Sequence, residues 1–290
     1  MWLRSRARGL SCRVLSELSR AASGEPGQSM QGNQELARVY LTRRIPHKAL
    51  QLLRDSGMGI RVGYTPDVLT NATAELTIAL LLATSRRLME AVAEVKNGGW
   101  GTWKPLWLCG FELSNSTVGI VGLGRIGLAV AQRLKPFGVK KFLYTDFEPK
   151  PVVAAEIQAE YVSLDKLAEE SDFVTVHCAL TPETKGICNK KLFSKMKKTA
   201  IFINTSRGAA VNQDDLYEAL ATGQIAAAGL DVTVPEPLPT DHRLLSLKNC
   251  VILPHIASGT ITTRTAMAVL TADNLLAALK DEPMLKELIL

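Results

Sequence analysis

The sequence predicts an α/β protein built on a doubly wound parallel sheet. Apolar strand-like segments alternate with amphipathic helical segments from residue 117 onward, and this alternation is typical of βαβ units. A glycine-rich turn joins the first of these strands to the first helix. Polar residues follow several later strands directly. Because ligands of open α/β sheets collect at the carboxyl ends of the strands, these polar residues are expected to share one edge.

Composition limits the classes of protein that are possible. The 290 residues suffice for one large or two ordinary domains, and 47% are hydrophobic. The longest apolar stretch, Leu76 to Thr84, is shorter than the roughly 20 residues of a membrane span. The net charge of +6 comes from residues 1–50, with nine basic and three acidic residues, whereas the rest holds 25 of each. We therefore expect no nucleic acid and no membrane among its partners.

Residues 1–36 form a basic tail. Its first 23 residues contain five arginines, several serines and a single acid, Glu17. This composition resembles a mitochondrial transit peptide, and the alternative is a disordered basic extension. We expect a cytoplasmic protein, with a mitochondrial form if the tail is a targeting segment. The five cysteines and four histidines are dispersed without ligand spacing, so no metal site is expected.

The elements before residue 117 are expected to be two short strands and two helices. Residues 37–42 and 60–64 read as strands, and 45–55 has helical spacing. A long helix should begin near Asn71, which with Thr70 could cap it, and should continue to Gly98 with Glu75 in its first turn. Its apolar residues lie on more than one face, so it should be buried against the body or another subunit.

The later elements alternate regularly. The expected strands are 117–123, 140–146, 161–164, 173–180, 199–206, 226–232 and 249–255. The expected helices are 126–137, 151–160, 165–172, 188–196, 213–223 and 264–280. A sheet of this kind is covered by helices on both faces.

The glycine turn is the first motif that indicates a ligand. It reads Gly122-Leu123-Gly124-Arg125-Ile126-Gly127. The first glycine permits the tight turn, the second lets a pyrophosphate approach the backbone, and the third lets helix and strand pack closely. The phosphates then lie at the positive end of the helix. In this context the motif predicts a dinucleotide-binding Rossmann domain.

An acid follows the next strand. Asp146 lies 24 residues after Gly122, where a carboxylate binds the ribose hydroxyls of NAD(H) and repels a 2′-phosphate. NADP(H)-binding proteins usually have a small residue followed by arginine there, and this chain has Phe147. The cofactor is therefore NAD(P)H with NAD(H) favoured, although three lysines (Lys140, Lys141 and Lys150) are near enough to complicate the preference.

Three residues that follow strands form a candidate catalytic group: Arg207, Glu236 and His255. An arginine can bind the carboxylate of a 2-oxo acid and polarise its carbonyl. A histidine can donate a proton to the developing alkoxide, and a neighbouring carboxylate favours the charged imidazolium. Taken singly, the three would be a surface ion-pair partner, a loop residue and a strand-end histidine.

Together these motifs resemble the D-isomer-specific 2-hydroxyacid dehydrogenases. The resemblance rests on the glycine turn, INTSRG at 203–208, AAGLDV with PEP at 227–237, and LPHIAS at 253–258. It implies that Arg207, Glu236 and His255 are catalytic. It also implies that Asp231 holds the nicotinamide carboxamide and that Thr73 and Thr205 lie along the cofactor.

Within that family, VGYTPDVLT at 62–70 and VKNGGWGTWKPLWLCG at 95–110 look most like the glyoxylate/hydroxypyruvate reductases. This implies reduction of small 2-oxo acid substrates, glyoxylate to glycolate and hydroxypyruvate to D-glycerate. It also implies a homodimer built by the helix containing Glu75 and the loop after it, with Trp103 reaching toward the neighbouring active site.

The chain departs from the family near Gly57. There Arg54 to Gly57 continues almost directly into Gly59 to Val62, and roughly 60–70 residues of the family's pattern, about half an ordinary domain, are absent. The expected domains are 63–262 for dinucleotide binding and dimerisation, and 37–62 with 263–290 as the remnant of a truncated flavodoxin-like substrate domain. Loss of the family's carboxylate-binding loop should impair substrate binding. The alternatives are a non-enzymatic dinucleotide-binding protein of the corepressor type and an inactive splice-form product.

Overall fold

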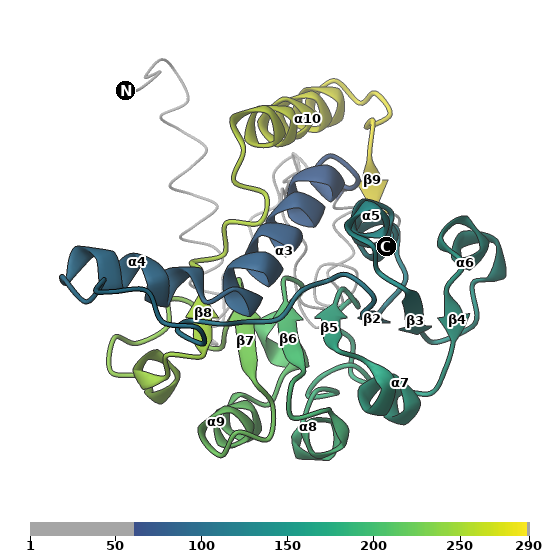
Figure 1. Ribbon diagram of the computed structural model, residues 1–290. Coiled ribbons are helices and arrows are strands. Elements are labelled where there is room, and N and C mark those ends of the chain that lie inside the picture. The colour runs from purple at the N-terminus through teal and green to yellow at the C-terminus, as the bar shows by residue number, and fades with distance from the viewer. Residues whose placement is uncertain (1–60, 289–290) are drawn as a thin grey trace, which may run out of the picture. The chain divides into compact units, whose positions relative to one another are not determined.

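The computed structural model describes residues 61–288 of the chain (Figure 1). The basic tail, the expected strand 37–42, the expected helix 45–55 and the junction at Gly57 lie outside the described residues. The chain divides into two units, one of Asp67–Met267 and one that includes residues 61–66 and 268–288. Each unit is described separately below.

The larger unit contains a seven-stranded parallel sheet in the order β4-β3-β2-β5-β6-β7-β8. The strands are β2 Thr117–Val121, β3 Lys141–Thr145, β4 Glu160–Tyr161, β5 Phe173–Val176, β6 Ile201–Asn204, β7 Ala227–Leu230 and β8 Cys250–Ile252. The order reverses between β2 and β5, and this switch point is where doubly wound sheets bind ligands. The predicted fold class is confirmed.

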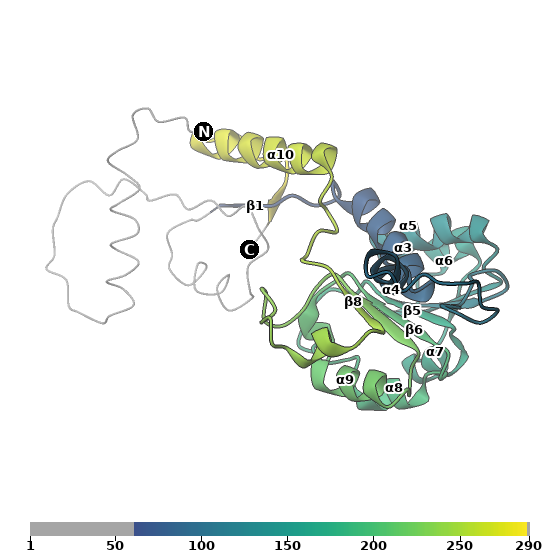
Figure 2. The same cartoon turned by 60° about the vertical axis from the view of Figure 1, so that its left-hand side comes forward.

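Helices cover both faces of this sheet, as Figure 1 and Figure 2 show. One face carries α3 Thr70–Ser85, α5 Arg125–Leu134 and α6 Pro151–Ile157, and the other carries α7 Leu164–Glu170, α8 Lys190–Lys195 and α9 Gln213–Ala221. Short 3-10 turns lie at Lys135–Phe137, Gly208–Ala210 and Arg243–Ser246. Each face has its own apolar core, and the strands contribute to both, which explains their nearly continuous apolar sequences.

The prediction of one long helix from Asn71 to Gly98 is wrong, because the structure divides this segment into α3 and α4 Leu88–Lys96. Arg87, between them, has a left-handed backbone (φ 54°), and its guanidinium makes a bidentate ion pair with Glu90. The helix begins at Thr70, close to the predicted Asn71, but the predicted cap and first-turn acid are wrong. The N-cap is Leu69 with no side-chain hydrogen bond, and no acid lies in the first turn. As expected, α3 is buried against the body through both apolar and threonine side chains.

In the smaller unit, β1 Val62–Gly63 pairs antiparallel with β9 Glu287–Leu288. Arg61 reinforces this pair through a bidentate ion pair with Glu287, and the arginine lowers the pKa of that carboxyl. The carboxamide of Asn274 donates to the carbonyl oxygens of Tyr64 and Lys286. Asn274 belongs to α10 Ile261–Leu279, which begins in the larger unit. Among residues 61–288, no helix is long and apolar enough to cross a membrane.

A half-buried histidine, with both ring nitrogens buried, follows β5 at the switch point. Neither ring nitrogen of His177 has a hydrogen-bond partner among the described residues, and burial lowers the pKa of His177 to about 4. The unfolded chain, with a histidine pKa near 6.5, therefore binds a proton at a higher pH than the folded chain does. The contribution of neutral His177 to the free energy of unfolding is complete above pH 6.5, and it should be lost as the pH falls toward 4.

We expect the free energy of unfolding to fall by about 3 kcal/mol more in the wild type than in His177→Leu between pH 7 and pH 4. Urea titrations followed by circular dichroism would measure the difference. His242→Asn is the matched control, because asparagine keeps an acceptor for the Leu244 amide that His242 caps. Parallel pH curves for wild type and His177→Leu would contradict the expectation.

Candidate functional site

The glycine turn has the geometry that its motif predicts. Gly122 has φ +95°, and a Cβ on it would lie 2.6 Å from the backbone nitrogen of Cys178. Gly127 is packed so closely that a Cβ would lie 2.5 Å from the carbonyl oxygen of Gly122. Gly124, at the N-cap of α5, faces open space instead. A side chain there would occupy the space in front of the helix N-terminus, where the phosphates of a dinucleotide bind, so the turn fits such a cofactor.

Asp146 lies directly beside this turn. Its Oδ2 accepts hydrogen bonds from the amide of Leu123 at 2.9 Å and from Lys150 Nζ at 2.7 Å, and its Oδ1 accepts from the amide of Phe147 at 2.9 Å. The expectation that three lysines are near this acid is wrong for two of them. Lys140 and Lys141 stand at the opposite end of β3, where Lys141 pairs with Glu160 and Glu170.

Two threonines predicted to lie along the cofactor are joined by a third. Thr77 Oγ1 donates to the carbonyl oxygen of Thr73 at 2.8 Å and lies 2.8 Å from Thr205 Oγ1. All three are buried. Thr77 was missed by the sequence reasoning, although its position one turn after Thr73 on α3 places both on the same helix face.

Glu236 and His255 are brought together at the carboxyl ends of the strands. His255 follows β8, and its Nδ1 lies 2.8 Å from Glu236 Oε2, with both side chains partly exposed. The other oxygen, Oε1, accepts from the amide of Thr233 at 3.1 Å. Gln213, the first residue of α9, holds the same segment by hydrogen bonds to both backbone groups of Val234. The glutamate that faces the imidazole is thus fixed from two sides.

Asp231 anchors the loop that carries His255. It is fully buried at the end of β7, and its two oxygens accept hydrogen bonds at 2.8 Å from the amides of Ile256 and Ala257. Burial raises the pKa of Asp231, and the two amides oppose that rise. His255 itself has a left-handed backbone with φ 54°. The conformation of this strained residue is therefore fixed by the two hydrogen bonds that follow it.

Arg207 and Trp103 are both exposed. Arg207 follows β6, and its Nη1 donates to the carbonyl oxygen of Ser206 at 2.6 Å. The next residue, Gly208, lies so close to the backbone of Thr233 that a Cβ there would overlap it. The loop of Arg207 is thus packed against the segment that leads to Glu236. Trp103, 79% exposed, lies between α4 and β2 and is not part of these strand-end contacts.

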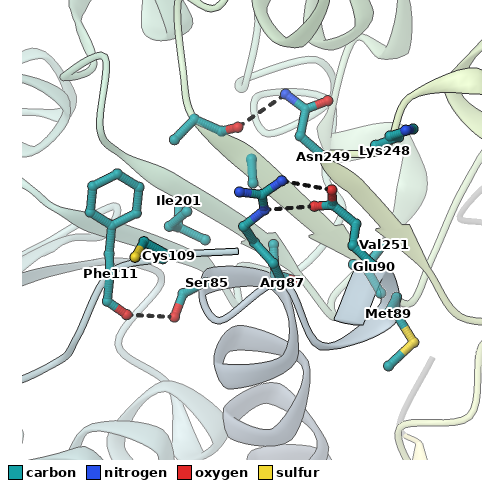
Figure 3. Close-up of a pocket in the computed structure, with 14 residues that line it drawn as sticks. Ser85, Arg87, Met89, Glu90, Cys109, Phe111, Ile201, Lys248, Asn249 and Val251 are labelled. Atoms are coloured by element: carbon teal, nitrogen blue, oxygen red, sulfur yellow. Dashed lines mark hydrogen bonds and ion pairs between the residues drawn. The ribbon is translucent and has the colours of Figure 1, made fainter. Parts of the chain in front are cut away.

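A cavity of about 380 Å³ lies at the other edge of the sheet (Figure 3). It is lined by residues at the amino ends of β6, β7 and β8, among them Ile201, Ala227 and Asn249, and by the start of α4. Figure 3 shows the bidentate pair of Arg87 with Glu90 on its wall. Because Asp146, Glu236 and His255 all follow the carboxyl ends of strands, this cavity is distinct from the candidate site.

The arrangement supplies a guanidinium, a carboxylate and an imidazole beyond the carboxyl ends of β6, β7 and β8, and a nucleotide-binding turn after β2. An imidazole whose Nδ1 donates to a carboxylate presents its other nitrogen, Nε2, for proton transfer. No group of three potential metal ligands occurs within residues 61–288.

Comparison with known proteins identifies the family. Residues 78–257 match the model described as D-isomer specific 2-hydroxyacid dehydrogenase, NAD binding domain. The glyoxylate reductase/hydroxypyruvate reductase of Homo sapiens is 66% identical over 244 residues, which is 84% of this chain and 74% of that protein. The mouse protein of the same name is 59% identical over 97% of this chain and 84% of its own length.

Among solved structures, the NADPH-dependent glyoxylate/hydroxypyruvate reductase of Sinorhizobium meliloti, in complex with NADP and malonate, has a TM-score of 0.72 at 37% identity, covering 82% of this chain and 73% of that one. The chain therefore belongs to the D-isomer-specific 2-hydroxyacid dehydrogenases, a family of NAD(P)-dependent oxidoreductases.

Proposed function

We propose that this chain reduces small 2-oxo acids with NAD(P)H, converting glyoxylate to glycolate and hydroxypyruvate to D-glycerate. The observation that supports the proposal most strongly is the 2.8 Å contact between His255 Nδ1 and Glu236 Oε2 at the carboxyl edge of a dinucleotide-binding domain. The names of the human, mouse and bacterial relatives are consistent with these substrates.

Each catalytic residue has a separate role in this proposal. Arg207 binds the substrate carboxylate and polarises the 2-oxo group. Glu236 orients the imidazole and stabilises its charged form, and His255 donates a proton to the substrate oxygen as the alkoxide develops. The reduced nicotinamide, when bound, supplies the hydride to the substrate's second carbon.

Cofactor binding would use the glycine turn and the residues around it. The amides at the start of α5 face the pyrophosphate, and Asp146 binds the adenine ribose, so NAD(H) is the favoured cofactor. The remaining contacts come from Thr73, Gly122, Gly124, Arg125, Ile126, Gly127, Thr205 and Asp231. Asp231 keeps lone pairs besides those that the amides of Ile256 and Ala257 occupy, and they can accept from the carboxamide.

The substrate-binding domain is the part of the proposed enzyme from which residues are missing. The junction after Gly57 leaves out the carboxylate-binding loop that the family pattern contains, and residues 37–62 with 263–290 are the proposed remnant of that domain. Arg207 would then fix the substrate carboxylate with less help. We expect this to raise KM more than it lowers the affinity for the cofactor, because the dinucleotide-binding residues are complete.

The chain is also proposed to form a homodimer through α3, α4 and the loop after them, the segment expected as one long helix containing Glu75 and its loop. Large apolar side chains are exposed along this segment: Leu88, Met89, Val92, Val95, Trp100, Trp103 and Leu106. Many exposed large apolar side chains in one segment are typical of a protein interface. In the proposed dimer Trp103 would reach toward the neighbouring active site.

Oxidation of NADH or NADPH at 340 nm by the full chain, with glyoxylate and with hydroxypyruvate, tests the proposed activity. Substrate-dependent oxidation with both acids is expected. Cofactor binding without any oxidation would instead favour a non-enzymatic dinucleotide-binding protein.

A further inference from the structure

Asp146, the acid that follows β3, forms an ion pair with Lys150, a lysine of the same loop. Lys150 Nζ lies 2.7 Å from Asp146 Oδ2, and the two side chains are only 33% and 12% exposed. The same oxygen accepts from the amide of Leu123 in the glycine turn. The ammonium is thus attached to the carboxylate that faces the predicted position of the adenine ribose.

The loop holds this lysine in place from both ends. The amide of Lys150 donates to the buried hydroxyl of Tyr144 at 2.8 Å. The hydroxyl of Tyr161 donates to the carbonyl oxygen of Asp146 at 3.3 Å, and the two tyrosine rings lie 5.3 Å apart. Lys150 is also the N-cap of α6, followed by Pro151. Its backbone is therefore fixed while its ammonium retains the freedom of a long side chain.

Other cations near the turn have different partners or positions. Arg125, in the turn itself, forms an ion pair with Asp67. Lys140 and Lys141 stand at the far end of β3, roughly 17 to 20 Å from Asp146 at the usual rise per residue of a strand. Within residues 61–288, Lys150 is consequently the cation that is paired with the acid expected to face the ribose.

We propose that Lys150 sets the cofactor specificity of this chain by making the Asp146 corner accept a 2′-phosphate as well as a 2′-hydroxyl. An isolated carboxylate repels a 2′-phosphate. With Lys150 at 2.7 Å the local charge is largely balanced, and the ammonium can turn to donate to the incoming phosphate. The inference rests on the dinucleotide binding in the proposed function, and it replaces a plain NAD(H) preference by dual use.

The test measures nucleotide binding and needs no turnover. Dissociation constants of 5′-AMP, adenosine 2′,5′-bisphosphate, NADH and NADPH are determined by calorimetry for the full chain, Lys150→Met and Lys150→Arg at low ionic strength. In Lys150→Met we expect the nucleotides with a 2′-phosphate to lose affinity by about tenfold or more relative to those without one. Lys150→Arg should keep the wild-type ratio. Lys140→Met, which removes the same charge at the other end of β3, is the matched control and should also keep it.

Equal weakening of both classes of nucleotide in Lys150→Met, or an unchanged ratio, would overturn the assignment. A wild type that binds only the nucleotides without a 2′-phosphate, 5′-AMP and NADH, would overturn it as well. If no nucleotide bound at all, the dinucleotide-binding part of the proposed function would be overturned together with it. Binding with the expected ratios but without reduction of 2-oxo acids would support the role of Lys150 and contradict only the proposed reaction.

Discussion

His255→Gln is expected to lower kcat for the reduction of glyoxylate by about 100- to 10,000-fold. Glutamine can occupy similar space and donate a hydrogen bond, but it cannot transfer a proton at neutral pH. The Glu236 carboxylate, 2.8 Å from the imidazole, would lose the partner that it orients. The dissociation constant for NADH should stay within about threefold of the wild type, because the glycine turn and Asp146 are unchanged.

Steady-state kinetics beside a cofactor titration would measure both quantities. His242→Asn, a histidine replacement at the start of a 3-10 turn outside the strand-end pair, is the matched control and should leave kcat unaltered. A His255→Gln variant with kcat close to that of the wild type would contradict the assignment of His255 as the proton donor.

Gly122→Ala is expected to lower the free energy of unfolding by about 3 kcal/mol or more and to abolish nucleotide binding. Two costs add at this position. The backbone has φ +95°, which side chains other than glycine rarely adopt, and the new Cβ would lie 2.6 Å from the backbone nitrogen of Cys178. Since Cys178 follows β5, relief of the clash must separate the two strand ends at the switch point or move the glycine turn.

Gly223→Ala separates these two costs. Gly223 also has a positive φ, +70°, but nothing lies within 4 Å of the position of its Cβ. It should lose only about 1–2 kcal/mol, the cost of the backbone conformation. Chemical unfolding and NADH titration of the two variants would provide the comparison. Equal losses in both would show that the close approach to Cys178 contributes nothing.

The parts of the molecule that the sequence predicts are those with local patterns. The alternation of apolar strands and amphipathic helices predicts the seven-stranded sheet, because strands buried on both faces must be nearly continuous in apolar residues. The glycine turn predicts its own geometry because Gly122 has a positive φ and Gly127 packs against the carbonyl oxygen of Gly122, five residues earlier.

The features that were missed depend on contacts between distant segments. The apolar pattern continues through Arg87, and what separates α3 from α4 is a left-handed residue, with the carbonyl oxygen of Ser85 accepting from Phe111 on the returning chain. The link between Thr77 and Thr205 joins residues 128 apart in the chain. Likewise, Lys150 can be distinguished from Lys140 and Lys141 only once the bounds of β3 are known, because those two lysines lie at the other end of that strand.

Asp231 illustrates the same limit within the candidate site. Its place at a strand end is evident in the sequence, and the family resemblance implies a role toward the nicotinamide. The contact that the structure adds, from both carboxylate oxygens to the amides after His255, depends on the parallel pairing of β7 with β8. A local pattern therefore locates the residue but does not identify its partner.

The most direct test of the proposed reaction is the oxidation of NADH and NADPH by the purified full chain at increasing glyoxylate and hydroxypyruvate, with His255→Gln beside it. We predict oxidation with both acids that requires His255 and saturates only at about 1 mM substrate or above, because Arg207 binds the carboxylate without the family's additional loop. A chain that binds NADH and still oxidises none of it at saturating substrate would contradict the proposed function.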